Sequence, residues 1–307
     1  MQRRLALLVL VLSAAACSRP QPNSARIDPA LVPLLPSDTT LAAGLRIDKL
    51  KNTAFYQQYI EGRRIPLFEE FAKKTGLDLR KDVWELCLAS NGRESVIFVR
   101  GKFGDLFGLE PQIRIEGMRR MNYKGYGMLG APQYAVMFLQ SGVAAVSDVT
   151  TLEAIIDNRD KPRQAPQAVL DLVQSLPPEA HAWVVTEDAG ALVPLLPRQG
   201  NFANLVPLVK DLRQLSAYAD LTAAARLRIR GEYGDPKVAK QTSNALRAVL
   251  GLVRMTSDKA QPAIKQLYDS IQVVLDDRTI SVSAESTLEV LEALPLGWRG
   301  DGVPQVH

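Results

Sequence analysis

The chain has 307 residues, of which 47% are hydrophobic and 23% are charged. This composition is typical of globular proteins, and it excludes a disordered tail, a collagen-like repeat and a low-complexity chain. Removal of an N-terminal segment that contains Arg3 and Arg4 leaves 35 basic and 33 acidic residues, a net charge of +2. So small a charge gives no indication of nucleic-acid binding. The length allows one large domain or two of ordinary size.

The N-terminus has the three regions of an export signal. Arg3 and Arg4 precede an uninterrupted apolar run, Leu5 to Leu12, and small residues then lead up to Cys17. The run is too short for a permanent transmembrane helix, which needs about 20 apolar residues. We therefore expect residues 1–16 to be a signal peptide that is removed after export.

The junction before Cys17 resembles the signal of bacterial lipoproteins, in which the cysteine is lipidated and becomes the first mature residue. One position departs from that pattern, since Ala14 stands where Leu is usual, and an ordinary signal peptidase is the alternative. The resemblance implies that Cys17 carries lipid such as palmitate, that the partner is a membrane, and that the protein faces the periplasm or exterior of the bacterial cell envelope. The polar, proline-interrupted residues that follow predict a flexible tether over 17–34.

Only two cysteines are present, so a lipidated Cys17 leaves Cys87 without an intramolecular partner. This excludes a disulfide-stapled fold, although export leads to an oxidising compartment. Because Cys87 lies in a short strand-like run, we expect a buried and inert thiol.

Three short motifs occur twice in the same order, which predicts an internal duplication. Their offsets of 141, 130 and 136 residues are similar but unequal, as expected when loops have changed length. We expect two α+β repeats, at 35–160 and 161–294, and a flexible tail at 295–307. The motif pairs are Leu-Pro-Ser-Asp at 35–38 with Leu-Pro-Pro-Glu at 176–179, Val-Arg-Gly-Lys-Phe-Gly-Asp at 99–105 with Ile-Arg-Gly-Glu-Tyr-Gly-Asp at 229–235, and Val-Ser-Asp-Val-Thr-Thr-Leu-Glu at 146–153 with Val-Ser-Ala-Glu-Ser-Thr-Leu-Glu at 282–289.

Apolar periodicity distinguishes strands from helices along the first repeat. Asn91-Gly92 predicts a two-residue hairpin turn between the second and third strands. The expected strands are 41–47, 84–90, 95–100, 134–139 and 143–147, and the expected helical segments are 53–74 and 150–158.

In the second repeat, Asp235 and Pro236 predict the cap and first position of a long helix. Hairpins join the strands in both repeats, so we expect an α+β fold with mainly antiparallel sheets and flanking helices. The expected strands are 215–219, 223–230, 271–275 and 279–284, and the expected helices are 236–254, 261–270 and 286–294.

A glycine motif lies between the second and third repeated motifs of the first half, and its spacing suggests nucleotide binding. Gly125–Gly130 matches the G-x-G-x-x-G pattern of dinucleotide-binding folds. Such folds need a buried apolar strand before the glycines and a helix after them, whereas Arg119–Lys124 precedes and Ala131-Pro132 follows. We expect glycine-kinked strands here and no cofactor.

Residues for catalysis are scarce. His181 and His307 are the only histidines, which excludes an H-E-x-x-H site and a Cys/His zinc set and leaves little room for a Ser-His-Asp triad. Neither a G-x-S-x-G elbow nor a P-loop is present. We expect no enzymatic activity, no metal and a structural role for His181.

Arg226, Arg228 and Arg230 alternate with the apolar residues Leu227 and Ile229. Alternation places the three arginines on one face of a strand, while Leu227 and Ile229 point inward. The arginines form either a solvated face or a contact with an anionic surface such as lipid headgroups. A second basic candidate is formed by Arg114, Arg119, Arg120 and Lys124 with Tyr123 and Tyr126.

Beyond the signal, the chain is similar to uncharacterised exported bacterial proteins whose mature part is a repeated α+β unit opening with a Leu-Pro-x-Asp strand, here at 35–38 and 176–179. We expect a membrane-tethered, non-enzymatic envelope lipoprotein that binds or scaffolds an envelope protein or component, and not nucleic acid. Two alternatives stay open: an envelope hydrolase that uses carboxylates alone, and a carrier of an apolar ligand between the two halves.

Overall fold

The computed structural model describes most of the chain between residues 26 and 290. The described ranges are 26–63, 65, 68–69, 72–73, 78–103, 117–131, 134–140, 142–159, 166–190, 192, 211–256, 262–288 and 290. The expected signal peptide, Cys17 and the expected tail at 295–307 lie outside them. Within these ranges, no helix combines the length and the apolar character that a membrane span needs.

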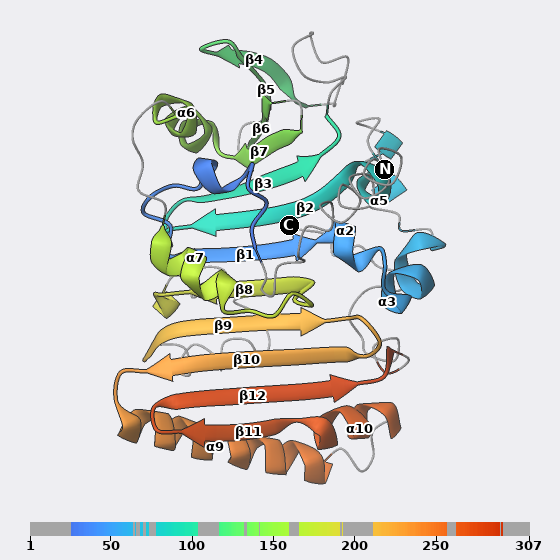
Figure 1. The fold of residues 1–307 in the computed structure, drawn as a ribbon, viewed down its shortest axis with the longest axis vertical. Coiled ribbons are helices and arrows are strands. Elements are labelled where there is room, and N and C mark those ends of the chain that lie inside the picture. Colours follow the sequence, from blue (N-terminus) through green and yellow to red (C-terminus); the bar gives the residue numbers. More distant parts are fainter. Residues whose placement is uncertain are drawn as a thin grey trace, which may run out of the picture.

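Strands dominate the fold and form one antiparallel sheet (Figure 1). The sheet has 12 strands in the order β11-β12-β10-β9-β8-β1-β2-β3-β7-β6-β5-β4. This confirms the antiparallel α+β class, with the strands of both halves in one sheet. The strands are β1 (Leu41–Arg46), β2 (Val83–Ser90), β3 (Ser95–Gly101), β4 (Arg119–Tyr123), β5 (Tyr126–Gly130), β6 (Ala135–Gln140), β7 (Val143–Ser147), β8 (Ala182–Thr186), β9 (Leu212–Asp220), β10 (Ala225–Tyr233), β11 (Gln272–Asp276) and β12 (Thr279–Ser286).

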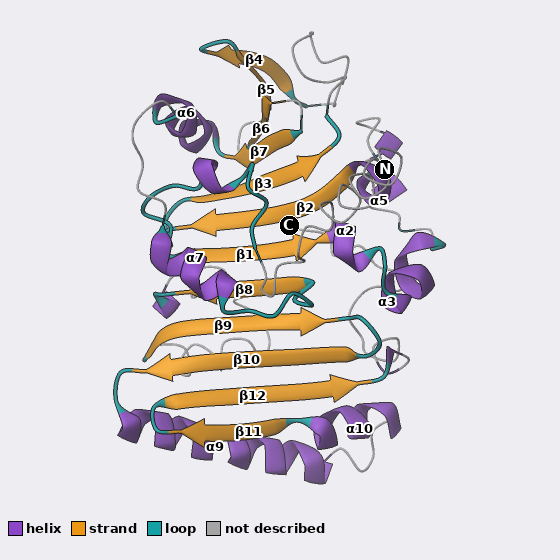
Figure 2. Ribbon diagram, viewed as in Figure 1, coloured by secondary structure: helices purple, strands orange, loops and turns teal. Residues whose placement is uncertain are grey.

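Helices flank this sheet (Figure 2), and some of them begin at a polar capping side chain. The Asp148 carboxylate accepts the backbone N–H of Thr151 at 2.9 Å, and Asp235 accepts that of Lys237 at 2.8 Å. The helical segments are η1 (Val32–Leu34), α2 (Ile47–Leu50), α3 (Ala54–Tyr56), the π-helical η2 (Gln57–Glu61), α5 (Leu79–Asp82), α6 (Val149–Asp157), α7 (Gln167–Gln174), α9 (Pro236–Thr256) and α10 (Pro262–Ser270).

Both halves use the same order of strands, counted outward from the middle of the sheet. The first half runs β1-β2-β3-β7-β6, and the second runs β8-β9-β10-β12-β11. The best repeated motif places Gly101 in β3 and Gly231 in β10, and the aromatic residues two positions later, Phe103 and Tyr233, are both buried. An internal duplication predicts this shared order, and the duplication itself stays a prediction.

The two halves meet where β1 pairs with β8. The ladder is antiparallel and joins Leu41 to Thr186, Ala43 to Val184 and Leu45 to Ala182. The first motif offset of 141 residues makes Ala43 the counterpart of Val184. The halves therefore pair through equivalent residues at the centre of the ladder, and a hydrogen-bonded strand pair occupies the boundary between them.

The sheet face that carries α7, called the front face below, is turned toward the viewer in Figure 1. In the first half, this face holds the main core cluster, which includes Phe98 and Val185. Helix α6 contributes Leu152 to the cluster, and α7 contributes Val169 and Val173. The first half therefore buries its front face beneath elements from both repeats.

The residues before β1 also pack on the front face of the first half, and together with α6 and α7 they form what we call its cover. Leu31 and Leu35 are buried in the main cluster, and the backbone N–H of Asp28 donates to Glu85 at 3.2 Å. The Asp28 carboxylate lies 3.3 Å from Nε of Arg100. The tether expected over 17–34 therefore ends earlier, because its apolar residues from Ile27 onward pack on the sheet.

The loop that joins β2 and β3 is longer than expected. Residues 91–94 connect β2 and β3, since Ser90 pairs with Ser95, so the two-residue turn predicted at Asn91-Gly92 is wrong. The Asn91 side chain accepts the N–H groups of Arg93 and Glu94, which stabilises the longer loop. A two-residue turn instead joins β4 and β5 at Lys124-Gly125, where both residues have positive φ.

Candidate functional site

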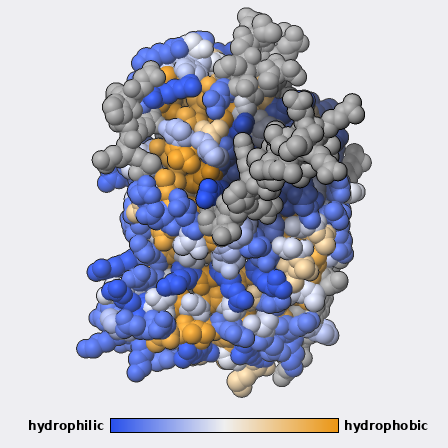
Figure 3. Space-filling model, viewed as in Figure 1, coloured by the Kyte–Doolittle hydropathy of each residue, from blue (hydrophilic) through white to orange (hydrophobic). Residues whose placement is uncertain are grey.

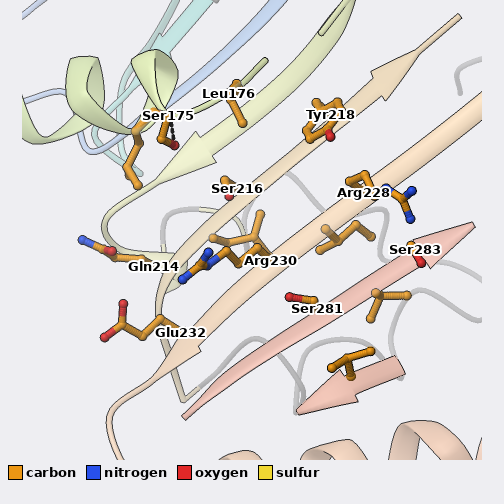
Figure 4. Close-up of a pocket in the computed structure, with 15 residues that line it drawn as sticks. Ser175, Leu176, Gln214, Ser216, Tyr218, Arg228, Arg230, Glu232, Ser281 and Ser283 are labelled. Atoms are coloured by element: carbon orange, nitrogen blue, oxygen red, sulfur yellow. Dashed lines mark hydrogen bonds between the residues drawn. The ribbon is translucent and has the colours of Figure 1, made fainter. Parts of the chain in front are cut away.

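A trough crosses the front face in the second half. Its volume is about 540 Å³, and its floor is formed by β9, β10 and β12. Figure 4 shows that Arg228 and Arg230 lie along β10 between Ser216 and Tyr218 on one side and Ser281 and Ser283 on the other. We call this surface the arginine trough.

Strand register explains why these residue types gather. Arg228 pairs with Tyr218 of β9 and Ser283 of β12, and Arg230 pairs with Ser216 and Ser281. Residues paired directly across an antiparallel ladder share a face, so two guanidinium groups lie between two rows of hydroxyls. These hydroxyls were not among the expected site residues, although the spacing of Ser216 with Tyr218 and of Ser281 with Ser283 puts each pair on one face of its strand.

The alternation predicted for β10 is correct for its arginines. Arg228 and Arg230 are exposed on the front face. Their apolar neighbours lie on the opposite face, where Ile229 is half-buried, but Leu227 is 42% exposed. The inward packing predicted for Leu227 is therefore wrong, since a residue on the opposite face is buried only where another element covers it.

Arg226 differs from the other two arginines because carboxylates neutralise it. Its guanidinium lies 3.3 Å from Asp220 of β9 and 3.2 Å from Glu285 of β12. At the other end of the same row, Glu232 pairs with Arg278 at 3.1 Å. The structure therefore separates Arg226 from the predicted three-residue set.

Arg228 and Arg230 have no ion pair and no side-chain hydrogen bond with any residue that the structure describes. In Figure 4 their guanidinium groups point away from each other along β10, with Arg230 directed toward Gln214. The trough therefore presents two separate positive charges in an otherwise neutralised row.

Apolar side chains border the trough at two of its sides. Leu172 and Leu176 lie at the end of α7, and Val274 of β11 is 54% exposed. Figure 3 shows hydrophilic side chains interspersed with apolar ones over this part of the front face. The trough thus combines charge, hydroxyls and limited apolar contact.

A second depression of about 480 Å³ adjoins the trough and shares Gln214 and Glu232 with it. Glu187, Asp188 and Arg213 also line it. Three carboxylates of the described residues therefore line this depression, but Glu232 is paired with Arg278 and Asp188 accepts the N–H of Gly190 at 2.9 Å. The carboxylate-only hydrolase stays an alternative prediction.

Two buried titratable groups lie outside both depressions. Burial raises the pKa of Glu85 to about 7, against an ordinary value of 4.5. Burial lowers the pKa of His181, whose Nδ1 accepts the backbone N–H of Leu221 at 3.1 Å. That hydrogen bond gives His181 a packing role, as the sequence indicated.

Two residues of the second basic candidate, Lys124 and Tyr123, contact an acidic partner. Lys124 lies 2.7 Å from the Asp157 carboxylate, which also accepts a hydrogen bond from the Tyr123 hydroxyl at 2.8 Å. Arg114 lies outside the described residues. These contacts fasten the β4–β5 hairpin to the end of α6.

The described part of the chain contains neither an exposed cysteine nor a metal-binding cluster. Cys87 is fully buried, and burial raises the pKa of its thiol, as the expected inert cysteine requires. Among the described residues, no group of three or more histidines, cysteines and carboxylates is arranged to hold a metal ion.

Comparison with solved structures shows the fold. The chain is similar to TP0453, an outer-membrane-associated lipoprotein of Treponema. One crystal form of TP0453 matches with a TM-score of 0.51 and 11% identity over 87% of this chain and 97% of that chain. A second form matches with a TM-score of 0.50 and 11% identity over 88% and 97%. No protein-family model matches, and no curated protein is similar in sequence.

Proposed function

We propose that the chain is a lipid-anchored, non-enzymatic lipoprotein of the bacterial cell envelope, and that it binds an envelope component through the arginine trough. The trough carries this proposal. It exposes two guanidinium groups that have no partner among the described residues, together with rows of hydroxyls, and such groups suit an anionic, hydroxyl-bearing ligand. Its lining includes serines but no histidine that could act as their base, and no metal-binding group occurs among the described residues.

The anchoring part of the proposal rests on the signal that ends at Cys17. The fold likeness to a lipoprotein is compatible with it. A lipid chain contributes about 0.8 kcal/mol per buried CH₂, and firm attachment needs more than one chain or a second contact. An anchored protein with an open binding face holds its ligand close to the membrane surface.

Anchoring is tested by producing the full chain and Cys17→Ser in a bacterium supplied with an alkyne-tagged fatty acid. The parent should take up the label and fractionate with membranes, and Cys17→Ser should lose the label and become soluble after processing. Cys87→Ala is the matched control, since Cys87 is buried and should not affect labelling.

Two results would contradict this part of the proposal. One is unchanged membrane association of an unlabelled Cys17→Ser protein whose signal peptide has been removed, and the other is a mature form of the parent that begins before Cys17. Fractionation measures the first, and mass spectrometry of the mature N-terminus identifies the second.

A further inference from the structure

We propose that the arginine trough binds a phosphorylated sugar that carries two separate phosphate groups. This inference deepens the proposed function, on which it rests, by naming the class of ligand. It is carried by the placement of Arg228 and Arg230, by the hydroxyls beside them and by an equivalent arginine in the first half that already holds an anionic group.

The two guanidinium groups favour two anionic groups over one. Residues two apart on a strand are separated by about 7 Å along it. Arg228 and Arg230 extend from that separation in opposite directions (Figure 4), so a single phosphate cannot contact both as they stand. A guanidinium is well suited to each phosphate, because its planar fork matches two phosphate oxygens.

The hydroxyl rows favour a sugar between the phosphates. Ser216 and Tyr218 lie on one side of the two arginines, and Ser281 and Ser283 lie on the other. Hydroxyl groups both donate and accept hydrogen bonds, which matches the hydroxyls of a sugar ring. The trough volume of about 540 Å³ falls within the range of small-molecule sites.

The first half shows what the equivalent arginine does when a partner is present. The repeated motif aligns Arg100 with Arg230, each directly before the motif's first glycine. Nε of Arg100 lies 3.3 Å from the carboxylate of Asp28, which the chain itself supplies. Arg230 has no such partner among the described residues, so the same position is open to an anion from outside.

Neighbouring charges set the extent of the site. Arg226 is neutralised by Asp220 and Glu285, so it adds no free positive charge at that end. Glu187 and Asp188 line the depression beyond Gln214 and limit how far an anion extends past Arg230. The ligand therefore lies over Arg228 and Arg230 alone.

The test compares glucose 1,6-bisphosphate with glucose 6-phosphate, by calorimetric titration of the mature chain carrying Cys17→Ser at constant ionic strength. The bisphosphate should bind at least about tenfold more tightly, because it makes one more charge-assisted contact than the monophosphate. Equal affinity for the two sugars would overturn the inference, as would heat that sodium chloride of the same ionic strength reproduces.

Variants assign the effect to the trough. Arg228→Gln and Arg230→Gln should each reduce bisphosphate affinity to that of the monophosphate, and Arg228→Lys should recover part of it by restoring the charge. Arg226→Gln is the matched control and should leave the affinity unchanged, since that arginine is already paired. An equal loss in Arg226→Gln would mean a diffuse charge effect and would overturn the site. Circular dichroism establishes that each variant is folded.

Binding to lipid vesicles distinguishes a lipid headgroup from a free sugar phosphate as the ligand. Phosphatidylcholine vesicles with and without a lipid-linked glucosamine disaccharide phosphorylated at both ends are compared. Binding only when this lipid is present assigns a lipid headgroup, and binding only of the soluble sugar assigns a free sugar phosphate. Equal binding to both kinds of vesicle, abolished by Leu252→Gln with Met255→Gln on the exposed side of α9, would place the contact on that helix and overturn the trough.

Failure of this inference is distinguishable from failure of the proposed function. Labelling and fractionation of Cys17→Ser measure lipid attachment and membrane association without any ligand. The titration measures sugar binding by the trough in a protein that has no lipid anchor. Normal anchoring with identical titrations of parent and Arg228→Gln would reject the sugar bisphosphate and leave the lipoprotein assignment intact.

Discussion

The front face of the sheet is covered in the first half and open in the second half. With the motif offset of 130 residues, Phe98 of β3 corresponds to Arg228 of β10. Phe98 is fully buried beneath the N-terminal segment and α6, whereas Arg228 is exposed in the trough. A covered face needs apolar residues to exclude water, and an open face tolerates charge. The elements that cover the front face, more than the strand order, therefore determine which residues this face can carry.

Loss of apolar contacts on the covered face should destabilise the protein most. Phe98→Ala should lower the free energy of unfolding by about 3–5 kcal/mol, because it leaves a cavity in the main cluster. Val274→Ala on the open face should change it by less than about 0.5 kcal/mol. Urea unfolding measures both. Similar losses for the two variants would mean that the open face is covered in solution.

A smaller effect comes from Glu85, which lies beneath the cover. Its pKa of about 7 exceeds the ordinary 4.5, chiefly through burial, with Asp28, Arg46 and Asp48 as charged neighbours. The folded state therefore binds the proton more tightly than the unfolded state. The stabilisation is complete below pH about 4.5 and is lost as the pH rises through about 7, amounting to roughly 3 kcal/mol at most.

Glu85→Gln should remove this part of the pH dependence, since the amide cannot ionise but still accepts the N–H of Asp28. Unfolding midpoints between pH 5 and pH 8 measure it. The same slope in parent and variant would assign the pH dependence to other groups.

The smallest effect is expected in the trough. Arg228→Gln with Arg230→Gln should change the free energy of unfolding by no more than about 0.5 kcal/mol each, because both side chains are exposed and have no partner among the described residues. Thermal unfolding without ligand measures it. A loss of several kcal/mol would show that these arginines serve the fold, and the contrast between the two halves would then be one of packing alone.

Much of the fold follows from periodicity. Strands β2, β3 and β12 were predicted within about two residues at each end, because alternation and turn residues are local signals. Helix α7 was missed, since its eight residues carry no capping side chain at the start. The joining of both halves into one sheet was also missed. The pairing of β1 with β8 links residues far apart in sequence, and no local pattern records it.

The site was predicted only in part. Alternation correctly put three arginines on one face of a strand. The pairing of Arg226 with Asp220 and Glu285 depends on which strands lie beside β10, so it needed the strand order. The same order brings the hydroxyls of β9 and β12 to the two remaining arginines.

The ladder at the middle of the sheet also determines which strand edges are already paired. Two equal units that meet through equivalent residues form a closed twofold pair, and no copy of that edge is left over. Ala43 faces Val184 in the β1–β8 ladder, which is the arrangement that the predicted duplication requires of such a pair. The outer strands of the described sheet are instead β4 and β11. The centre of the sheet is thereby protected from the edge-to-edge growth to which unpaired strands are prone.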